Sequence, residues 1–356
     1  MIARAREWAL RLAMLAVSVA IVVTGFEIWL RSYDRPWGLA LVAHPGSPRL
    51  ARLTPGAAGE IAGVPVRVNS AGYRGRDLAL PKPAGVYRIG LLGDSMTFGW
   101  GVREEETFAA RLESALARVR PDRAWEVANF AMIGANTAQA AEAYTVDVAR
   151  YDPDLVLLGF FMNDVDPPVL ASVGGGAGGV DGGGDGADRT VAPRTRAVSL
   201  VPRRTLAFVK TRGAALARRA GIPMRGSTVA RYADEFASRG DAWRACERGI
   251  HSLRDDVTAD GGRFGVVILP FMVSLDASYP LRDAHGQVAA ACREAGVPVL
   301  DLLPSFLGKS AATLSVTPLD NHMNGEAHAI AADAILAWLV SGPMLDAAAA
   351  PPDSVE

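Results

Sequence analysis

This sequence contains little cysteine and has no large excess of charge of either sign. The only two cysteines, Cys246 and Cys292, have no CxxC spacing and no neighbouring histidines, which argues against a disulfide framework and against a zinc site. Two buried free thiols are the expected state, and one disulfide is the alternative if the domain is exported. Lys plus Arg number 37 against 38 Asp plus Glu, so no basic field would gather nucleic acid.

What the sequence does contain is a long apolar run near its N-terminus. The segment from Trp8 to Leu30 carries charges only near its ends, and as a helix it would extend about 34 Å, enough to cross a hydrocarbon core of about 30 Å. Arginines precede the run, and Trp8 and Trp29 fall at the two expected interfaces. We therefore expect residues 1–31 to be a single-pass anchor in the inner (cytoplasmic) membrane, with the rest of the chain periplasmic or otherwise extracytoplasmic.

A cleaved signal peptide is the alternative interpretation of this run. Ser18 and Ala20 provide the small-x-small spacing of a signal peptidase site. Cleavage there would leave Ile21, Val22 and Val23 at the new terminus, with the apolar run continuing, so a retained anchor is favoured. Both interpretations export the rest of the chain.

Composition divides the remainder into three regions. Residues 32–83 are rich in Pro, Gly and Arg and predict an extended lead-in rather than a domain. Residues 84–342 predict one folded domain, interrupted at 165–227 by an insertion whose glycine-rich centre should be flexible. That centre has one irregular Gly/Asp repeat, which favours a linker over a calcium site. The Ala- and Pro-rich tail, 343–356, is predicted to be disordered.

Strand and helix patterns alternate through the domain. Val86–Leu92 is a short apolar run typical of a strand buried on both faces, and an amphipathic helix is expected from Glu105 to Val119. Further strands are expected at 125–130, 155–161, 264–270 and 297–300, and further helices at 137–150, 241–257, 281–295 and 325–339. Because helices return the chain between parallel strands, this alternation predicts a parallel sheet covered on both faces, with ligands at the carboxyl ends of its strands.

Ser95 is the candidate nucleophile. Gly93-Asp94-Ser95 directly follows the first predicted strand, and a serine hydroxyl there needs a neighbouring base, while local backbone N–H groups can hold an oxyanion. By itself this tripeptide is more typical of a turn or a helix cap. Residues near the C-terminal end of the chain favour the role of nucleophile over that of a turn or cap. His322 can accept the Ser95 proton on one ring nitrogen while Asp320 holds the other and sets the tautomer.

Two more strand ends carry groups that suit this chemistry. Gly134 follows the second strand and can offer its backbone N–H where a side chain would obstruct substrate. Asn163 follows the third strand, and its side-chain amide can donate to the same oxyanion. Alone, Gly134 is typical of a tight turn and Asn163 of a cap. Four such clusters in the order Ser, Gly, Asn, Asp-His predict one site.

Four blocks of this sequence resemble those of the SGNH or GDSL hydrolase superfamily, and the resemblance extends from about Tyr87 to Leu339. The blocks are Gly93–Gly99, Gly134, Asn163-Asp164 and Asp320-x-His322. The resemblance implies a three-layer α/β/α, flavodoxin-like parallel sheet. It also implies a triad of Ser95, Asp320 and His322, with an oxyanion hole of Ser95 N–H, Gly134 N–H and Asn163.

Two longer stretches of sequence point to one branch of the superfamily, and some positions depart from the family pattern. Asn69–Gly75 and Phe98-Gly-Trp-Gly-Val resemble a membrane-anchored bacterial branch of the superfamily. Phe161 stands where the family often has glycine, the nearest glycine being Gly159, and Met323 replaces a frequent proline. One residue, rather than the commoner two, separates the Asp from the His. These departures bear on the shape of the pocket, and no catalytic position is missing.

The expected activity is ester hydrolysis through an acyl-serine intermediate, without metal or organic cofactor. The outward location predicts a small-molecule or glycan ester as substrate, with an O-acetyl group on an envelope glycan as the leading example. Two alternatives stay open: an O-acyltransferase in envelope polysaccharide modification, and a non-catalytic SGNH-like module that binds a glycan or a protein. The intact Ser-His-Asp set argues against the last.

Overall fold

The computed structural model describes residues 2–33, 38–167, 228–317 and 320–345. Helix α1 (Ile2–Tyr33) belongs to one compact unit, and the described residues from 38 onward belong to another. The glycine-rich centre of the predicted insertion lies outside the described residues, as does the tail from 346 on. Residues Pro343–Leu345, predicted to be part of that tail, instead form a short 3-10 turn with Met344 and Leu345 buried.

Helix α1 contains the predicted apolar segment. The stretch Arg11–Ile28 is long and apolar enough to cross a membrane, judged by length and composition. Its large apolar side chains are exposed, Leu12 at 62% and Val22 at 70%, which is the surface that lipid would solvate.

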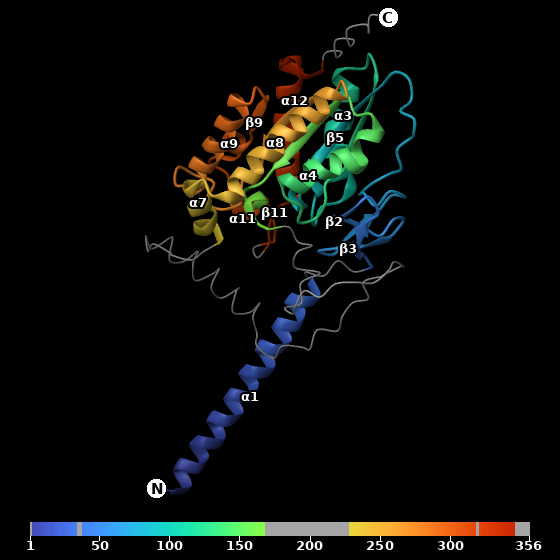
Figure 1. Ribbon diagram of the computed structural model, residues 1–356. Helices are drawn as coiled ribbons and strands as arrows, with labels where there is room; N and C mark the ends of the chain where they lie inside the picture. The colour runs from blue at the N-terminus through green and yellow to red at the C-terminus, as the bar shows by residue number, and fades with distance from the viewer. Residues whose placement is uncertain (1, 34–37, 168–227, 318–319, 346–356) are drawn as a thin grey trace, which may run out of the picture. The chain divides into compact units, whose positions relative to one another are not determined.

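The second unit is built on a five-stranded parallel sheet in the order β6-β5-β7-β8-β9 (Figure 1). Its strands are β5 (Val86–Gly93), β6 (Ala124–Asn129), β7 (Leu155–Phe160), β8 (Arg263–Ile268) and β9 (Val299–Asp301). Counted within the sheet this is the order 2-1-3-4-5, the flavodoxin-like arrangement. The predicted fold class is therefore confirmed. The strand order reverses between β5 and β7, where sheets of this kind bind their ligands.

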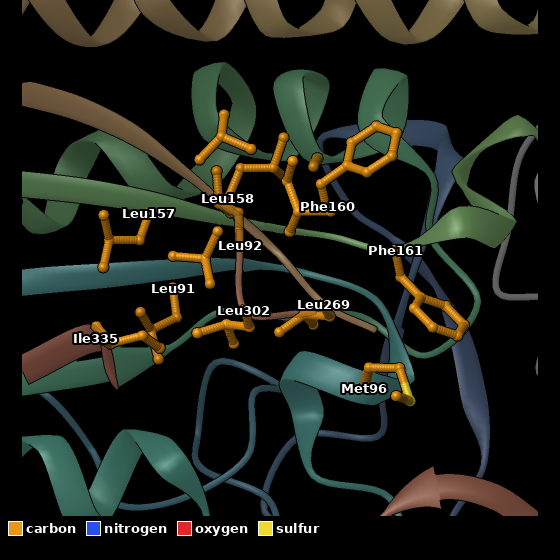
Figure 2. Close-up of a cluster of buried hydrophobic side chains, with 14 of the residues drawn as sticks. Leu91, Leu92, Met96, Leu157, Leu158, Phe160, Phe161, Leu269, Leu302 and Ile335 are labelled. Atoms are coloured by element: carbon orange, nitrogen blue, oxygen red, sulfur yellow. The ribbon is translucent and has the colours of Figure 1, made fainter. Parts of the chain in front are cut away.

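Helices cover both faces of the sheet. On one face α12 (Gly325–Ser341) packs against α3 (Phe108–Val119), and on the other α4 (Thr137–Ala143) packs against α8 (Asp241–Ala259) (Figure 1). Figure 2 shows Ile335 of α12 beside Leu91, with Leu158 and Phe160 on the opposite side of the strands. The Phe160 ring contacts Trp243 of α8, with the ring centroids 6.5 Å apart. Because both faces are covered, the strands are mostly apolar rather than alternating, and the buried Arg88 of β5 is paired with Glu126 of β6.

After β5, the described part of this unit also contains five further α-helices and one antiparallel hairpin. They are the helices α2 (Ser95–Phe98), α7 (Thr228–Ser238), α9 (Arg282–Glu294), α10 (Leu303–Phe306) and α11 (Ala311–Leu314), and the antiparallel hairpin of β10 (Ser315–Thr317) and β11 (Asp320–Met323). The predicted helix at 137–150 is split, because α4 ends at Ala143 and continues as a π-helical turn, Tyr144–Val148. That turn carries Asp147, which accepts a hydrogen bond from the Tyr73 hydroxyl at 2.7 Å.

The lead-in has more structure than its composition predicts. It contains two antiparallel hairpins, formed by β1 (Leu41–His44) with β2 (Ser47–Leu53) and by β3 (Ala58–Ile61) with β4 (Val64–Arg67). Apolar residues of the hairpins form a second small core together with Phe98 and Ala131, which lie beyond the ends of the sheet strands β5 and β6. Most of these strands are only four residues long, too short to give a periodic pattern against the Pro- and Gly-rich background.

Candidate active site

Ser95 is the first residue of the one-turn helix α2, directly after β5. Asp94 caps this helix, because its Oδ1 accepts a hydrogen bond from the Met96 N–H at 2.8 Å. The two roles that the tripeptide suggests are thus divided between neighbours. Asp94 provides the cap, and the Ser95 hydroxyl points elsewhere.

The Ser95 hydroxyl faces His322. Its Oγ lies 2.8 Å from His322 Nε2, and His322 Nδ1 lies 2.5 Å from Asp320 Oδ1. The His322 backbone N–H also donates to Asp320 Oδ1 at 3.0 Å. Ser95 is buried, whereas the His322 side chain is 28% exposed, so the site is open to solvent on one side. The structure therefore brings together all three residues proposed from sequence as a triad.

The hairpin of β10 and β11 supplies Asp320 and His322. In a strand, side chains two residues apart point to the same side, so Asp320 and His322 share one face and Asn321 lies on the other. Asn324 then caps α12 by accepting from the N–H groups of Glu326 and Ala327, and its amide donates to Thr313 O at 2.7 Å. The same amide donates to Ser315 O at 3.3 Å, which attaches β10 to the start of α12.

The Asp320 carboxylate is held on both oxygens. Burial by itself would raise the pKa of Asp320, but hydrogen bonds and charge from His322, together with the Trp100 N–H, lower the pKa below its usual value. Trp100 Nε1 donates to Asp320 Oδ2 at 3.0 Å. Asp320 is thus an anion beside the imidazole under all mildly acidic and neutral conditions, as the acid of a serine triad must be.

Asn163 and Gly134 follow the two strands that flank β5. Asn163 follows β7, and its Nδ2 donates to Asp94 Oδ2 at 2.9 Å. Gly134 follows β6, in a loop that Met132 attaches to β5 by donating to Gly93 O at 2.9 Å. Within the described part of the chain, the backbone N–H groups of Ser95 and Gly134 have no hydrogen-bond acceptor. These two donors, and the second hydrogen of the Asn163 amide, remain available.

Two fully buried carboxyls lie beneath the site. Burial raises the pKa of Asp94, against the hydrogen bonds from Met96 and Asn163. Burial, followed by the charge of Asp94, raises the pKa of Asp164 well above its usual value. The Thr137 hydroxyl donates to Asp164 Oδ2 at 2.5 Å. Two like charges are not both stable in such a place, and burial together with the charge of Asp94 favours the protonated form of Asp164.

Some residues of the site gave no clear pattern in the sequence. Gly159 is one of them: a Cβ there would lie 2.1 Å from Thr97 Oγ1, so only glycine lets α2 approach β7 this closely. Asn129 donates to the carbonyls of Thr97 and Phe98 at the end of α2. Asn129 is the last residue of β6, and a polar residue at the end of a buried strand was its only indication in the sequence.

Other reactive groups are placed away from this chemistry. Cys246 and Cys292 are buried and unpaired, and burial raises the pKa of both thiols, that of Cys292 to about 12, so neither is a ready nucleophile. Nowhere in the described ranges do three or more His, Cys, Asp or Glu side chains form a group that could hold a metal ion. A cavity of about 600 Å³ lies between the lead-in and α3, and neither Ser95 nor His322 lines it.

Several solved structures are similar to this chain, all at low identity. An alpha/beta hydrolase enzyme from the metagenome of Lake Arreo, Spain, is 15% identical, with 73% of this chain and 97% of that chain covered and a TM-score of 0.43. An acetylxylan esterase from Geobacillus stearothermophilus, Axe2, is 15% identical over 70% of this chain and 93% of that one, with a TM-score of 0.43. TesA is 12% identical over 72% and 99%, also with a TM-score of 0.43. The chain matches no curated protein.

The comparison with protein families is more specific. Residues 91–330 match the family described as the GDSL-like Lipase/Acylhydrolase family. The matched span begins within β5, just before the Gly93-Asp94-Ser95 turn, and ends within α12, beyond His322. It covers well over half of the sequence. The chain belongs to the GDSL-like lipase/acylhydrolase family and has the SGNH hydrolase fold.

Proposed function

We propose that this protein is a serine ester hydrolase in which Ser95 is the nucleophile, His322 the general base and Asp320 the residue that orients His322. The observation that carries the proposal is the continuous contact from Ser95 Oγ to His322 Nε2 at 2.8 Å and from His322 Nδ1 to Asp320 Oδ1 at 2.5 Å. Serine becomes nucleophilic only beside such a base, and a base needs a third group to set its tautomer.

The reaction follows from these contacts. Ser95 Oγ attacks the ester carbonyl carbon while His322 Nε2 takes the hydroxyl proton, and the resulting imidazolium is stabilised by the Asp320 carboxylate. The same proton then passes to the leaving alcohol oxygen as the C–O bond breaks, which leaves an acyl-serine. A water molecule, deprotonated by His322, attacks the acyl carbon and releases the carboxylic acid and free Ser95.

Three donors are proposed for the oxyanion that forms at each attack. They are the backbone N–H groups of Ser95 and Gly134 and the side-chain amide of Asn163. The support is that both N–H groups lack a protein acceptor within the described residues and that Asp94 holds only one of the two Asn163 amide hydrogens. Donors already oriented toward the developing charge stabilise the transition state without reorganisation.

The proposed substrate is an O-acyl ester, with an O-acetyl group on an envelope glycan as the leading example. We propose that α1 is retained as a single-pass anchor and that the hydrolase unit lies on the extracytoplasmic side. The length and apolar composition of Arg11–Ile28 support the anchor, and the partial exposure of His322 suits a substrate too large to enter a closed pocket.

The test uses the full chain in detergent, assayed on short-chain aryl esters. Ser95→Ala should lower kcat by about 10³-fold or more, because the remaining groups cannot form the acyl intermediate. Ser252→Ala, at an exposed serine of α8, is the matched control and should retain wild-type turnover. A fluorophosphonate probe should label the wild type and not the Ser95→Ala protein. Equal turnover by the Ser95→Ala and wild-type proteins would reject the proposal.

Product analysis addresses the acyl acceptor. With an acetyl donor and a glycan present together, free acetate should be the main product if water is the acceptor. Predominant acetylation of the glycan would replace hydrolysis by acyl transfer at the same serine.

A further inference from the structure

Trp100 contacts both members of the acid–base pair. Its Nε1 donates to Asp320 Oδ2 at 3.0 Å, and its ring stacks on the His322 imidazole with centroids 5.5 Å apart and an interplanar angle of 25°. Asp320 Oδ1 is already bound to His322 Nδ1. Each carboxylate oxygen therefore has a different partner, and the carboxylate cannot rotate without breaking one of the two hydrogen bonds.

The loop that carries Trp100 is held by the lead-in. The buried guanidinium of Arg74 donates to the carbonyls of Phe98, Gly99 and Val102, at 3.1, 2.6 and 2.5 Å. Its Nε also pairs with Glu104 at 3.0 Å. Arg74 thus binds carbonyls on both sides of Trp100 and keeps the loop in one conformation.

The other side of the loop is closely packed as well. A Cβ at Gly101 would lie 2.7 Å from a Val316 methyl group, and Val316 is on β10, in the hairpin that carries Asp320 and His322. Trp100 itself is half-buried and packs against the small core formed by the hairpins of the lead-in. The indole is therefore fixed from the lead-in side and from the β10–β11 side at once.

We propose that Trp100 is a positioning residue that orients the Asp320 carboxylate and the His322 ring toward Ser95, with Arg74 holding Trp100 in place. This inference rests on the proposed hydrolase function and deepens it. A serine triad requires the imidazole to keep one tautomer and one orientation while its charge changes, which the hydrogen bond and the stacked ring together provide. The lead-in is then part of the catalytic apparatus, acting through Trp100.

The experiment compares Trp100→Phe, Trp100→Leu and Trp125→Phe in the full chain. Trp100→Phe keeps a stacked ring and removes the N–H, and Trp100→Leu removes both. Trp125 is buried at the start of β6 and donates its Nε1 hydrogen to Arg120 O at 2.7 Å, so Trp125→Phe is a matched loss of one indole hydrogen bond away from the site. We expect Trp100→Phe to lower kcat by about 10–100-fold with little change in KM, because a hydrogen bond to a charged group is lost. Trp125→Phe should leave kcat unchanged.

The pH profile separates positioning from a general structural role. The groups facing His322 that carry or can carry charge are Asp320, Asp94 and His328. Without the Trp100 N–H, Asp320 loses one of the hydrogen bonds that lower its pKa. The pH profile of kcat/KM should therefore change in Trp100→Phe and stay as in the wild type in Trp125→Phe.

A fluorescence titration tests the contact without turnover. Protonated imidazole quenches an indole stacked against it, so wild-type tryptophan emission should fall on acidification, and this fall should be absent in Trp100→Phe and in His322→Gln. Wild-type kcat and pH profile in Trp100→Phe would overturn the inference, as would equal losses in Trp100→Phe and Trp125→Phe. If Ser95→Ala is inactive while Trp100→Phe behaves as the wild type, only the role of Trp100 fails. If Ser95→Ala turns over like the wild type, the hydrolase proposal itself fails.

Discussion

At the scale of single residues, the position of Ser95 depends on neighbouring residues that each have a separate structural role. Asp94 caps α2 and receives the Asn163 amide, which leaves the Ser95 hydroxyl free to face His322. Gly159 has no side chain where Thr97 needs the space. Each of these positions has a local physical reason for its residue type, independent of the reaction. The Ser95 hydroxyl is thus placed by groups outside the proposed triad.

Asn163 provides the residue-scale prediction. Asn163→Ala should lower kcat by about 10²–10³-fold with little change in KM, because an oxyanion donor acts mainly in the transition state. Steady-state kinetics on an aryl ester measures this. Asn321→Ala is the control, since Asn321 lies on the opposite face of β11 and should keep nearly full activity. If the two variants lose activity equally, Asn163 is not a specific donor.

At the scale of elements, α12 and α3 are joined through a buried histidine. The Phe108 N–H at the start of α3 donates to His328 Nδ1 at 3.1 Å, and the two rings stack with centroids 5.3 Å apart. This hydrogen bond requires a neutral imidazole with an unprotonated Nδ1. Burial, followed by the nearby charges of Arg74 and Arg111, lowers the pKa of His328 to about 3.

The sign of the resulting pH dependence follows from linkage. In the unfolded chain this histidine becomes protonated as pH falls below about 6.5, whereas in the folded chain it stays neutral down to about pH 3. The stability contribution is complete above the unfolded pKa and is lost as pH falls toward the folded one. One such group lowers the free energy of unfolding by at most about 1.4 kcal/mol per pH unit in that range.

His328→Gln tests this at the level of the helix pair. The free energy of unfolding, measured by urea denaturation, should fall between pH 6 and pH 5 in the wild type. In His328→Gln this fall should be smaller by about 1 kcal/mol. His251→Gln removes an exposed histidine of α8 and should unfold with the wild-type pH dependence. An unchanged slope in His328→Gln would mean that His328 is not held neutral in the folded protein.

At the scale of the whole molecule, the described residues form an apolar helix and a unit with the SGNH hydrolase fold. Their separation in composition is sharp: α1 exposes large apolar side chains, whereas the second unit buries its own in the sheet layers and the small lead-in core. A helix with exposed apolar side chains is stable only in lipid, in detergent or against another apolar surface. Membrane anchoring is therefore proposed as a property of the intact chain.

Expression in a bacterial host tests the anchor and its orientation. The full chain should remain in the membrane fraction after alkaline extraction, and alkaline phosphatase fused after residue 356 should be active, as expected for an extracytoplasmic domain. Val19→Arg is the control, because one arginine near the centre of the span costs about 2.5–3.5 kcal/mol on the insertion scale and should weaken retention. An inactive phosphatase fusion would contradict the orientation.

Periodicity and strand-end position by themselves determined the parallel sheet and the placement of Ser95, Gly134 and Asn163, because such patterns depend on local backbone geometry. The lead-in hairpins were not recognised, since three of their four strands are only four residues long, too short to show a period. The meeting of Ser95 with His322 across 227 positions was a hypothesis from residue chemistry. Only the tertiary structure decided that Trp100 lies on this pair and that Arg74 holds the loop, because contacts between distant segments depend on how layers and hairpins pack together.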